Sequence, residues 1–475
     1  MASNKVFKTL SASTIQIVLN QFLGLVVFYL TSRFLSKDDY GELNWTIAFV
    51  SIVTAIIGLG TDYIILKRVA SGQNIKQTIG LHIFHTLTAG LLLTFSIIIV
   101  KRAFPSFFEK HYLLTSVGIS VLITFLTNPF KQLANGKEAF LQLAIMMVSN
   151  NMAKSLLLLT LLVSNTFTIN KVVQIFILSS VVELITSVII ARKKFNVSIF
   201  PYFNGAQYRS LISEAFPQLG VMIFDSALAR IDWIILGFAT GPVATAEYSF
   251  TYKIFEISRL PMLILAPVIL PKFIRYFGEE QLSTSKVDEL NLLIRIEAFI
   301  SVIIPIFFCI SWIPLMGTIT GGKYGTSCAP IYLILSAAVP LHYYTNFLWT
   351  MAFAQRQMKL TFYITVIVSV FNVIINLILI PKIGTVGAAI AFLLSTILQL
   401  CLYKSLVKQQ SLKVKIQPLI SGIIIAITAI FLARSLFANV FLATLFGLTF
   451  YLVVSFLTRL IRKEDLIQVK TLLRR

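Results

Sequence analysis

The feature that most constrains this chain is a succession of long apolar stretches, set nearly end to end. A helix needs about 20 apolar residues to cross the hydrocarbon core of a bilayer. Because lipid offers no hydrogen bonds to the backbone, only helices and closed barrels can span it. The stretches are too long and too evenly apolar for barrel strands, which alternate over about ten residues. The sequence therefore predicts an all-α polytopic membrane protein.

We count fourteen predicted spans joined by short connections. The longest connections, near 192–214 and 271–290, are too short for a soluble catalytic domain, so we expect no enzyme. The spans lie near 11–32, 41–60, 78–100, 112–130, 139–163, 171–191, 215–238, 246–270, 291–312, 329–354, 360–380, 386–404, 415–433 and 438–458.

The net charge of +21 invites a nucleic-acid partner, but the position of the charges argues against one. Lys and Arg sit at the ends of the predicted spans, as membrane topology requires, and not on one soluble face. The cysteines Cys309, Cys328 and Cys401 are isolated and form neither a disulfide framework nor a metal spacing. We predict no nucleic-acid partner, no metal and no cofactor.

Orientation follows from the distribution of positive charge. With the amino terminus in the cytoplasm, 26 of the 40 Lys and Arg lie on the cytoplasmic side and nine on the opposite side. This bias fits the positive-inside rule and an even number of spans. We predict a multi-pass protein with both termini in the cytoplasm. The first apolar run, after Lys5 and Lys8, is interpreted as an uncleaved span.

A faint internal repeat suggests two halves. The segment after Asn128 resembles that after Asn346, and the segment after Val148 resembles that after Val368, at offsets of 218 and 220 residues. Six spans separate each pair, which indicates two parallel six-helix lobes with a binding cavity between them and alternating access. We predict an N-lobe over 1–200, a C-lobe over 201–410, and two accessory helices with the tail over 411–475.

Ionisable residues within spans are costly and are hypotheses for function. Lys253, Glu256 and Arg259 share one helical face and suggest a polar stripe lining a water-filled cavity, where cations suit a phosphate. Alternatively, these charges only pair with one another to hold helices together. The candidates for binding a substrate headgroup are Lys154, Arg230, Lys253 and Arg259; those for H⁺ or Na⁺ coupling, or for charge pairing, are Glu183, Asp225, Asp232 and Glu256.

Four segments carry a family resemblance. Residues 34–49 resemble an "L-G-x-x-x-Y-G" loop and second span, with Ser36 in place of the first glycine. Residues 58–68 resemble "GLG-x-D…R", and residues 232–237 resemble "D-x-x-x-L-G", with Tyr248 following. Residues 376–391 match "N-x-x-L-I-P-x-x-G-x-x-G-A-A-x-A". Together they resemble the polysaccharide transporter (O-antigen flippase) branch of the multidrug/oligosaccharidyl-lipid/polysaccharide (MOP) exporter superfamily, over essentially the whole chain.

The resemblance implies two six-helix lobes plus two accessory helices, and a flippase for polyprenyl-pyrophosphate-linked oligosaccharides. It also implies a bacterial inner membrane as the location, and membrane lipids and a polysaccharide polymerase as partners. Arg230, Lys253 and Arg259 are the implied intramembrane cations for the headgroup. The alternative is an ion-coupled small-molecule or drug antiporter of the same superfamily, in which acids such as Asp225 and Glu256 bind the substrate or the coupling ion.

Overall fold

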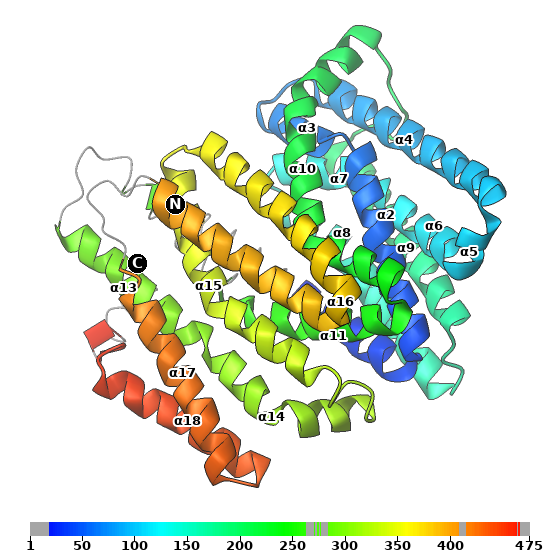
Figure 1. Cartoon of the computed structure of the whole chain (residues 1–475). Coiled ribbons are helices and arrows are strands. Elements are labelled where there is room, and N and C mark those ends of the chain that lie inside the picture. The colour runs from blue at the N-terminus through cyan, green and yellow to red at the C-terminus, as the bar shows by residue number, and fades with distance from the viewer. Residues whose placement is uncertain are drawn as a thin grey trace. The chain divides into compact units, whose positions relative to one another are not determined.

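The computed structural model describes residues 19–262, 270, 273–274, 276, 284–407, 415–462 and 464–465. Every regular element within these ranges is an α-helix. Eight of the described helices are long and apolar enough to cross a membrane. The described residues pack as two compact units, assigned to Met1–Ala246 and Glu247–Arg475, and the chain passes from one to the other within α11 (Figure 1).

The first unit begins with helical residues 19–34 and continues through ten labelled helices. Ser36 accepts a hydrogen bond from the Asp39 amide at the start of α2, and Asn74 and Asn204 cap α4 and α10 in the same way, as short polar residues do at helix starts. These helices are α2 (Lys37–Ile57), α3 (Thr61–Ala70), α4 (Ile75–Ala103), α5 (Pro105–Lys110), α6 (Leu114–Phe125), α7 (Asn128–Gly136), α8 (Phe140–Val163), α9 (Ile169–Phe195), α10 (Gly205–Ala239) and the start of α11 (Pro242–Ser258).

In the second unit, the long helix α15 packs against α16, and the pair α17 and α18 packs against α13 and α14. Apolar side chains form the core between α14, α17 and α18, among them Ile306, Ile310, Ala429 and Tyr451. The helices that follow α11 are α13 (Thr284–Ser301), α14 (Ile303–Thr320), α15 (Ala329–Ala354), α16 (Met358–Leu406), α17 (Gln417–Leu436) and α18 (Val440–Leu457).

Each predicted span coincides with one helix or a broken pair, as far as the described residues reach. The second span is α2, the fourth is α6 with the start of α7, and the ninth is the end of α13 with the start of α14; α3 lies in the predicted connection after the second span. The eleventh and twelfth spans form the two arms of α16, which are separated at the non-helical residues Ile383 and Gly384. The start of the first span and the end of the eighth lie outside the described residues. The prediction of an all-α membrane fold is confirmed.

Two motif glycines explain close helix contacts in the first unit. Gly60 has a φ of +72° at the break between α2 and α3, a conformation that glycine adopts without steric cost. Gly237 lies where α10 meets α2, and a Cβ there would collide with the indole ring of Trp45. The Trp45 indole nitrogen donates to the Ile234 carbonyl oxygen at 3.3 Å. The motif residues therefore join α2 to α10.

Because α10 packs against α2 and α3, the seventh predicted span belongs to the first compact unit. The compact units are defined by packing contacts, whereas the predicted lobes are defined by the repeat of six spans, so the one division does not test the other. The lobe boundaries near residues 200 and 410 stay a prediction.

Candidate functional site

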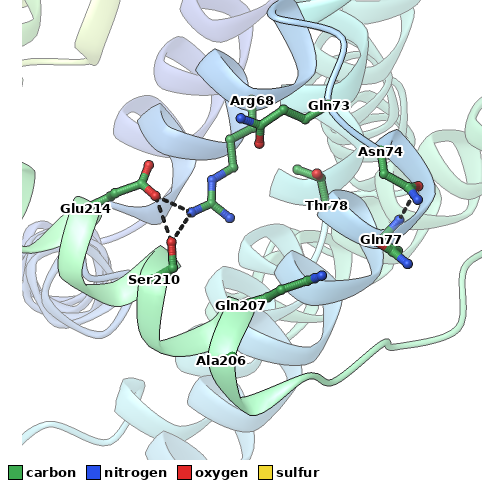
Figure 2. Close-up of a pocket in the computed structure, with 9 residues that line it drawn as sticks. All are labelled: Arg68, Gln73, Asn74, Gln77, Thr78, Ala206, Gln207, Ser210 and Glu214. Carbon is green, nitrogen blue, oxygen red and sulfur yellow. Dashed lines mark hydrogen bonds and ion pairs between the residues drawn. The ribbon is translucent and has the colours of Figure 1, made fainter.

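A polar pocket opens in the first unit, where the connection from α3 to α4 faces the first turns of α10 (Figure 2). Its volume of about 450 Å³ falls within the range of about 300–1,000 Å³ that small-molecule sites occupy. Ala206 is the only apolar side chain among its described lining residues. That lining consists of Arg68, Gln73, Asn74, Gln77, Thr78, Ala206, Gln207, Ser210 and Glu214.

Arg68, the arginine of the "GLG-x-D…R" motif, anchors one wall of the pocket. Its guanidinium donates to a Glu214 carboxylate oxygen at 2.5 Å and to the Ser210 hydroxyl at 3.1 Å. Only 12% of the Arg68 side chain is exposed, against 45% for Glu214. Figure 2 shows the other terminal nitrogen of Arg68 pointing toward the middle of the pocket. That edge of the guanidinium can donate to a ligand oxygen.

Glu214 has a pKa below the ordinary value of a glutamate. Partial burial by itself would raise this pKa, but the hydrogen bonds from Arg68 and Ser210 and the charges of Arg68 and Lys67 lower it. Glu214 is therefore ionised at neutral pH and cancels the charge of Arg68. The pocket lining as a whole then carries no net charge.

The remaining lining groups are neutral amides and hydroxyls. Gln73, Gln77 and Gln207 supply side-chain amides, and Thr78 and Ser210 supply hydroxyls. Amides and hydroxyls both donate and accept hydrogen bonds, as does a sugar hydroxyl. The pocket can therefore bind a polyhydroxylated, uncharged ligand better than an isolated anion.

A second polar cluster lies among the helices of the first unit and contains two predicted residues, Lys154 and Glu183. Glu183 is 3% exposed, forms an ion pair with Lys131, and accepts from the Asn150 amide at 2.5 Å. The Lys154 ammonium lies 4.4 Å from the centre of the Phe176 ring and interacts electrostatically with Glu183 and Lys131. The two lysines outnumber the one carboxylate, which leaves an excess of positive charge.

The three predicted charges of α10 have different surroundings. Asp225 is exposed, whereas Asp232 is 3% exposed and accepts from the Trp233 backbone amide at 2.9 Å. The Arg230 guanidinium lies over the Trp233 ring at 4.1 Å, a cation–π contact. Asp232 and Trp233 both belong to the "D-x-x-x-L-G" segment that packs against α2.

The stripe predicted on the eighth span contains a charge pair. The Lys253 ammonium donates to a Glu256 carboxylate oxygen at 2.6 Å, and each side chain is about one third exposed. The Arg259 guanidinium lies 5.6 Å from the centre of the Phe255 ring. Lys253 and Glu256 therefore form the kind of charge pair that the alternative interpretation predicts. Because both side chains are partly exposed, they are also accessible to a ligand. Their role, like that of the other predicted site residues, stays a prediction.

Sequence reasoning missed several polar contacts between helices. Asp62 of the family motif lies 3.0 Å from a ring nitrogen of His82 and accepts from the Asn128 amide at 2.9 Å. Glu42 and His111 make a similar buried contact at 3.2 Å. The residues of each pair are far apart in the sequence, so no local spacing could reveal the contact; the signal was that Glu42 and His82 are polar residues within predicted apolar spans.

Comparisons with known proteins place this geometry in context. A family model described as "Polysaccharide biosynthesis protein" matches residues 6–277. No curated protein matches the chain.

Solved structures of transporters share the fold. The lipid II flippase MurJ in an inward closed conformation is similar over 93% of this chain and 97% of its own, with a TM-score of 0.74 and 14% identity. An inward-facing multidrug resistance MATE family transporter of the MOP superfamily is similar over 84% of this chain and 99% of its own, with a TM-score of 0.66 and 14% identity. At such identities, the likeness shows the fold alone.

Proposed function

Because the chain belongs to the polysaccharide biosynthesis protein family, whose model matches residues 6–277, we propose that it is a flippase for lipid-linked oligosaccharides. Its substrate is a polyprenyl-pyrophosphate-linked sugar repeat unit, moved from the inner to the outer leaflet by alternating access for the assembly of a surface polysaccharide such as O-antigen. The site of action is the bacterial inner membrane, and a polysaccharide polymerase is the expected partner. The proposal includes no catalytic step.

The observation that carries the proposal is the amide-rich pocket beside Arg68. An oligosaccharide headgroup needs many neutral hydrogen-bonding groups, and the pocket supplies them in a chain that is otherwise largely apolar. The predicted topology places this pocket on the cytoplasmic side, where the substrate is loaded. The excess cation beside Glu183 supports binding of the pyrophosphate, because charge-assisted hydrogen bonds to phosphate are strong.

The alternative is an ion-coupled antiporter for small molecules. It is supported by the likeness of the fold to a multidrug resistance MATE transporter and by the exposed carboxylate of Asp225 on α10. In that case the cargo is a small cation, and the acids rather than the lysines bind it.

Lipid analysis of cells that lack this chain separates the two functions. For a flippase, mass spectrometry finds polyprenyl-pyrophosphate bearing a complete sugar repeat, the surface polymer is lost, and the intact gene restores it. Unchanged lipids and polymer, together with increased sensitivity to cationic drugs, would support the antiporter.

Site variants test which charges act on the substrate. We expect Lys253→Ala and Arg259→Ala to reduce restoration of the surface polymer while the protein still inserts at wild-type levels. The matched control is Lys359→Ala, because Lys359 is an exposed cation at the start of α16. Full restoration by both variants would refute the assignment of these cations to the headgroup.

The pocket has its own test. Gln207→Ala removes a lining amide, and we expect it to lower restoration of the polymer. Arg209→Ala is the control, since Arg209 is exposed in the same helical turn but is absent from the lining of the pocket. Equal activity of the two variants would exclude the pocket from the transport path.

A further inference from the structure

A glutamate of the second unit is buried without a hydrogen-bonding partner. Glu297, in α13, is 3% exposed, and within the described ranges neither of its carboxyl oxygens has a hydrogen-bond partner. The residues around it are almost entirely apolar or aromatic. They are Ile294 and Ala298 of α13, Pro340, Tyr343, Tyr344 and Phe347 of α15, and Leu419 of α17.

The groups around this carboxyl do not supply a counter-charge in the described part of the chain. On α13, the Arg295 guanidinium donates to Asp465 at 2.6 Å. On α15, the titratable side chains are Tyr332, His342, Tyr343 and Tyr344, and the Tyr343 hydroxyl donates to the Ser258 carbonyl oxygen at 3.2 Å. Arg259 and Glu297 both act electrostatically on Tyr343, but no ion pair joins them in the described residues.

The other helices packed against α13 are even less polar. α14 has no Asp, Glu, Lys or Arg. The one such residue of α17 is Arg434, which donates to the Cys309 carbonyl oxygen. An ionised carboxylate without a partner in such surroundings is very costly, and the group instead takes up a proton and becomes neutral. The described surroundings of Glu297 thus favour its neutral form in this conformation.

The size of the space beside the carboxyl favours H⁺ over Na⁺ as the bound ion. It has no room for a water molecule. A hard cation such as Na⁺ is held by several oxygen ligands, as Ca²⁺ and Mg²⁺ are, whereas the described side chains of this lining add only two tyrosine hydroxyls to the carboxyl. A proton needs neither a cavity nor further ligands.

We propose that Glu297 is a proton-binding site of the second unit, occupied by H⁺ in this conformation and selective for H⁺ over Na⁺. Release of the proton requires that α13, α15 and α17 separate enough to admit water to the carboxyl. A proton gradient can act on the protein at this position. The inference is independent of the cargo and goes beyond the proposed function.

Infrared spectroscopy of the purified full-length chain tests the proposal without a substrate. We expect the wild-type protein at neutral pH to show the carbonyl stretch of a protonated carboxylic acid, and Glu297→Gln to lose it. Glu256→Gln is the matched control and should retain the band, because Glu256 is paired with Lys253 and partly exposed. Replacing choline with Na⁺ in the buffer should leave the band unchanged.

Two results would overturn the proposal. One is a wild-type spectrum at neutral pH that contains only ionised carboxylates, which needs no variant and so holds even if Glu297→Gln does not fold. The other is a band at this residue that disappears when Na⁺ is added, which would make Glu297 a sodium ligand. Transport data do not enter either result, so failure here leaves the flippase proposal to its own test.

Discussion

Trp45 and Gly237 meet where α2 contacts α10, and the indole ring leaves no space for a side chain at position 237. We expect Gly237→Ala to destabilise the protein by about 1–3 kcal/mol, the usual cost of overpacking. The measurement is the melting temperature of the detergent-solubilised protein. Gly90→Ala is the control, because Gly90 is helical and has space for a Cβ; equal melting of the two variants would contradict the packing argument.

The ion pair of Arg68 and Glu214 makes stability depend on pH in a defined direction. Because the pKa of Glu214 is lowered in the folded chain, its contribution is present above the ordinary pKa of a glutamate and is lost as the pH falls through the lowered value. The side chain is 45% exposed, so solvent screening limits the effect to about 1 kcal/mol or less.

We therefore expect Glu214→Gln to melt slightly below the wild type at neutral pH and together with it in acid. The measurement is the melting temperature of both proteins at a series of pH values from neutral to acid. Glu109→Gln is the control, because Glu109 is exposed. A difference that grows as the pH falls would show that the sign is wrong.

Local spacing predicted some contacts between residues and could not predict others. Lys253 and Glu256 are three residues apart on one helix, and that spacing alone brings their side chains together. Lys131 of α7 and Glu183 of α9 form an ion pair, so their contact depends on how the two helices pack. Glu297 was visible in the sequence as a charge within a span, but its lack of a partner is a property of the packed helices.

At the scale of elements, the two ends of α4 can be used to determine how the chain is oriented in the membrane. Its first residues border the polar pocket, while Leu91, Leu92 and Phe95 in its second half are exposed apolar side chains that suit contact with lipid. Lys101 and Arg102 end the helix. The predicted topology places the pocket end in the cytoplasm.

Cysteine labelling tests this orientation. We expect a membrane-impermeant maleimide to label Arg102→Cys in intact spheroplasts and Gln73→Cys only after permeabilisation. Leu92→Cys, in lipid, should stay unlabelled in both. The background is Cys401→Ser, since Cys401 is the exposed native cysteine in the described ranges. Labelling of Gln73→Cys in intact spheroplasts would reverse the topology.

The existence and length of the spans could be predicted because an apolar stretch of about 20 residues matches the thickness of the hydrocarbon core. The chain turns at Gly58–Gly60, where the second span was predicted to end, through the left-handed residues Leu59 and Gly60. The division of the fourth span at residues 126–127 was not predicted and carries no strong local signal. Hydropathy measures transfer to lipid and does not depend on such changes in backbone direction.

At the scale of the whole molecule, the compact units suggest where the chain can be divided. α10 is joined to the first unit by Trp45, Gly237 and the Arg68–Glu214 pair. We expect a fragment of residues 1–240 to melt cooperatively in detergent and a fragment of residues 1–200 to melt at a lower temperature or aggregate. Similar melting of both fragments would favour the lobe boundary predicted near residue 200.

The two arms of α16 meet at the non-helical residues Ile383 and Gly384, and Asn372 of one arm donates to Ser395 of the other at 3.0 Å. We therefore expect the two arms to insert into the membrane as one hairpin, with Lys382 beside its tip. A ribosome stalled shortly after residue 384 would hold a hydrophobic segment whose polar Asn372 still lacks its partner. We expect insertion of this region to depend on the pair of spans together rather than on each span separately.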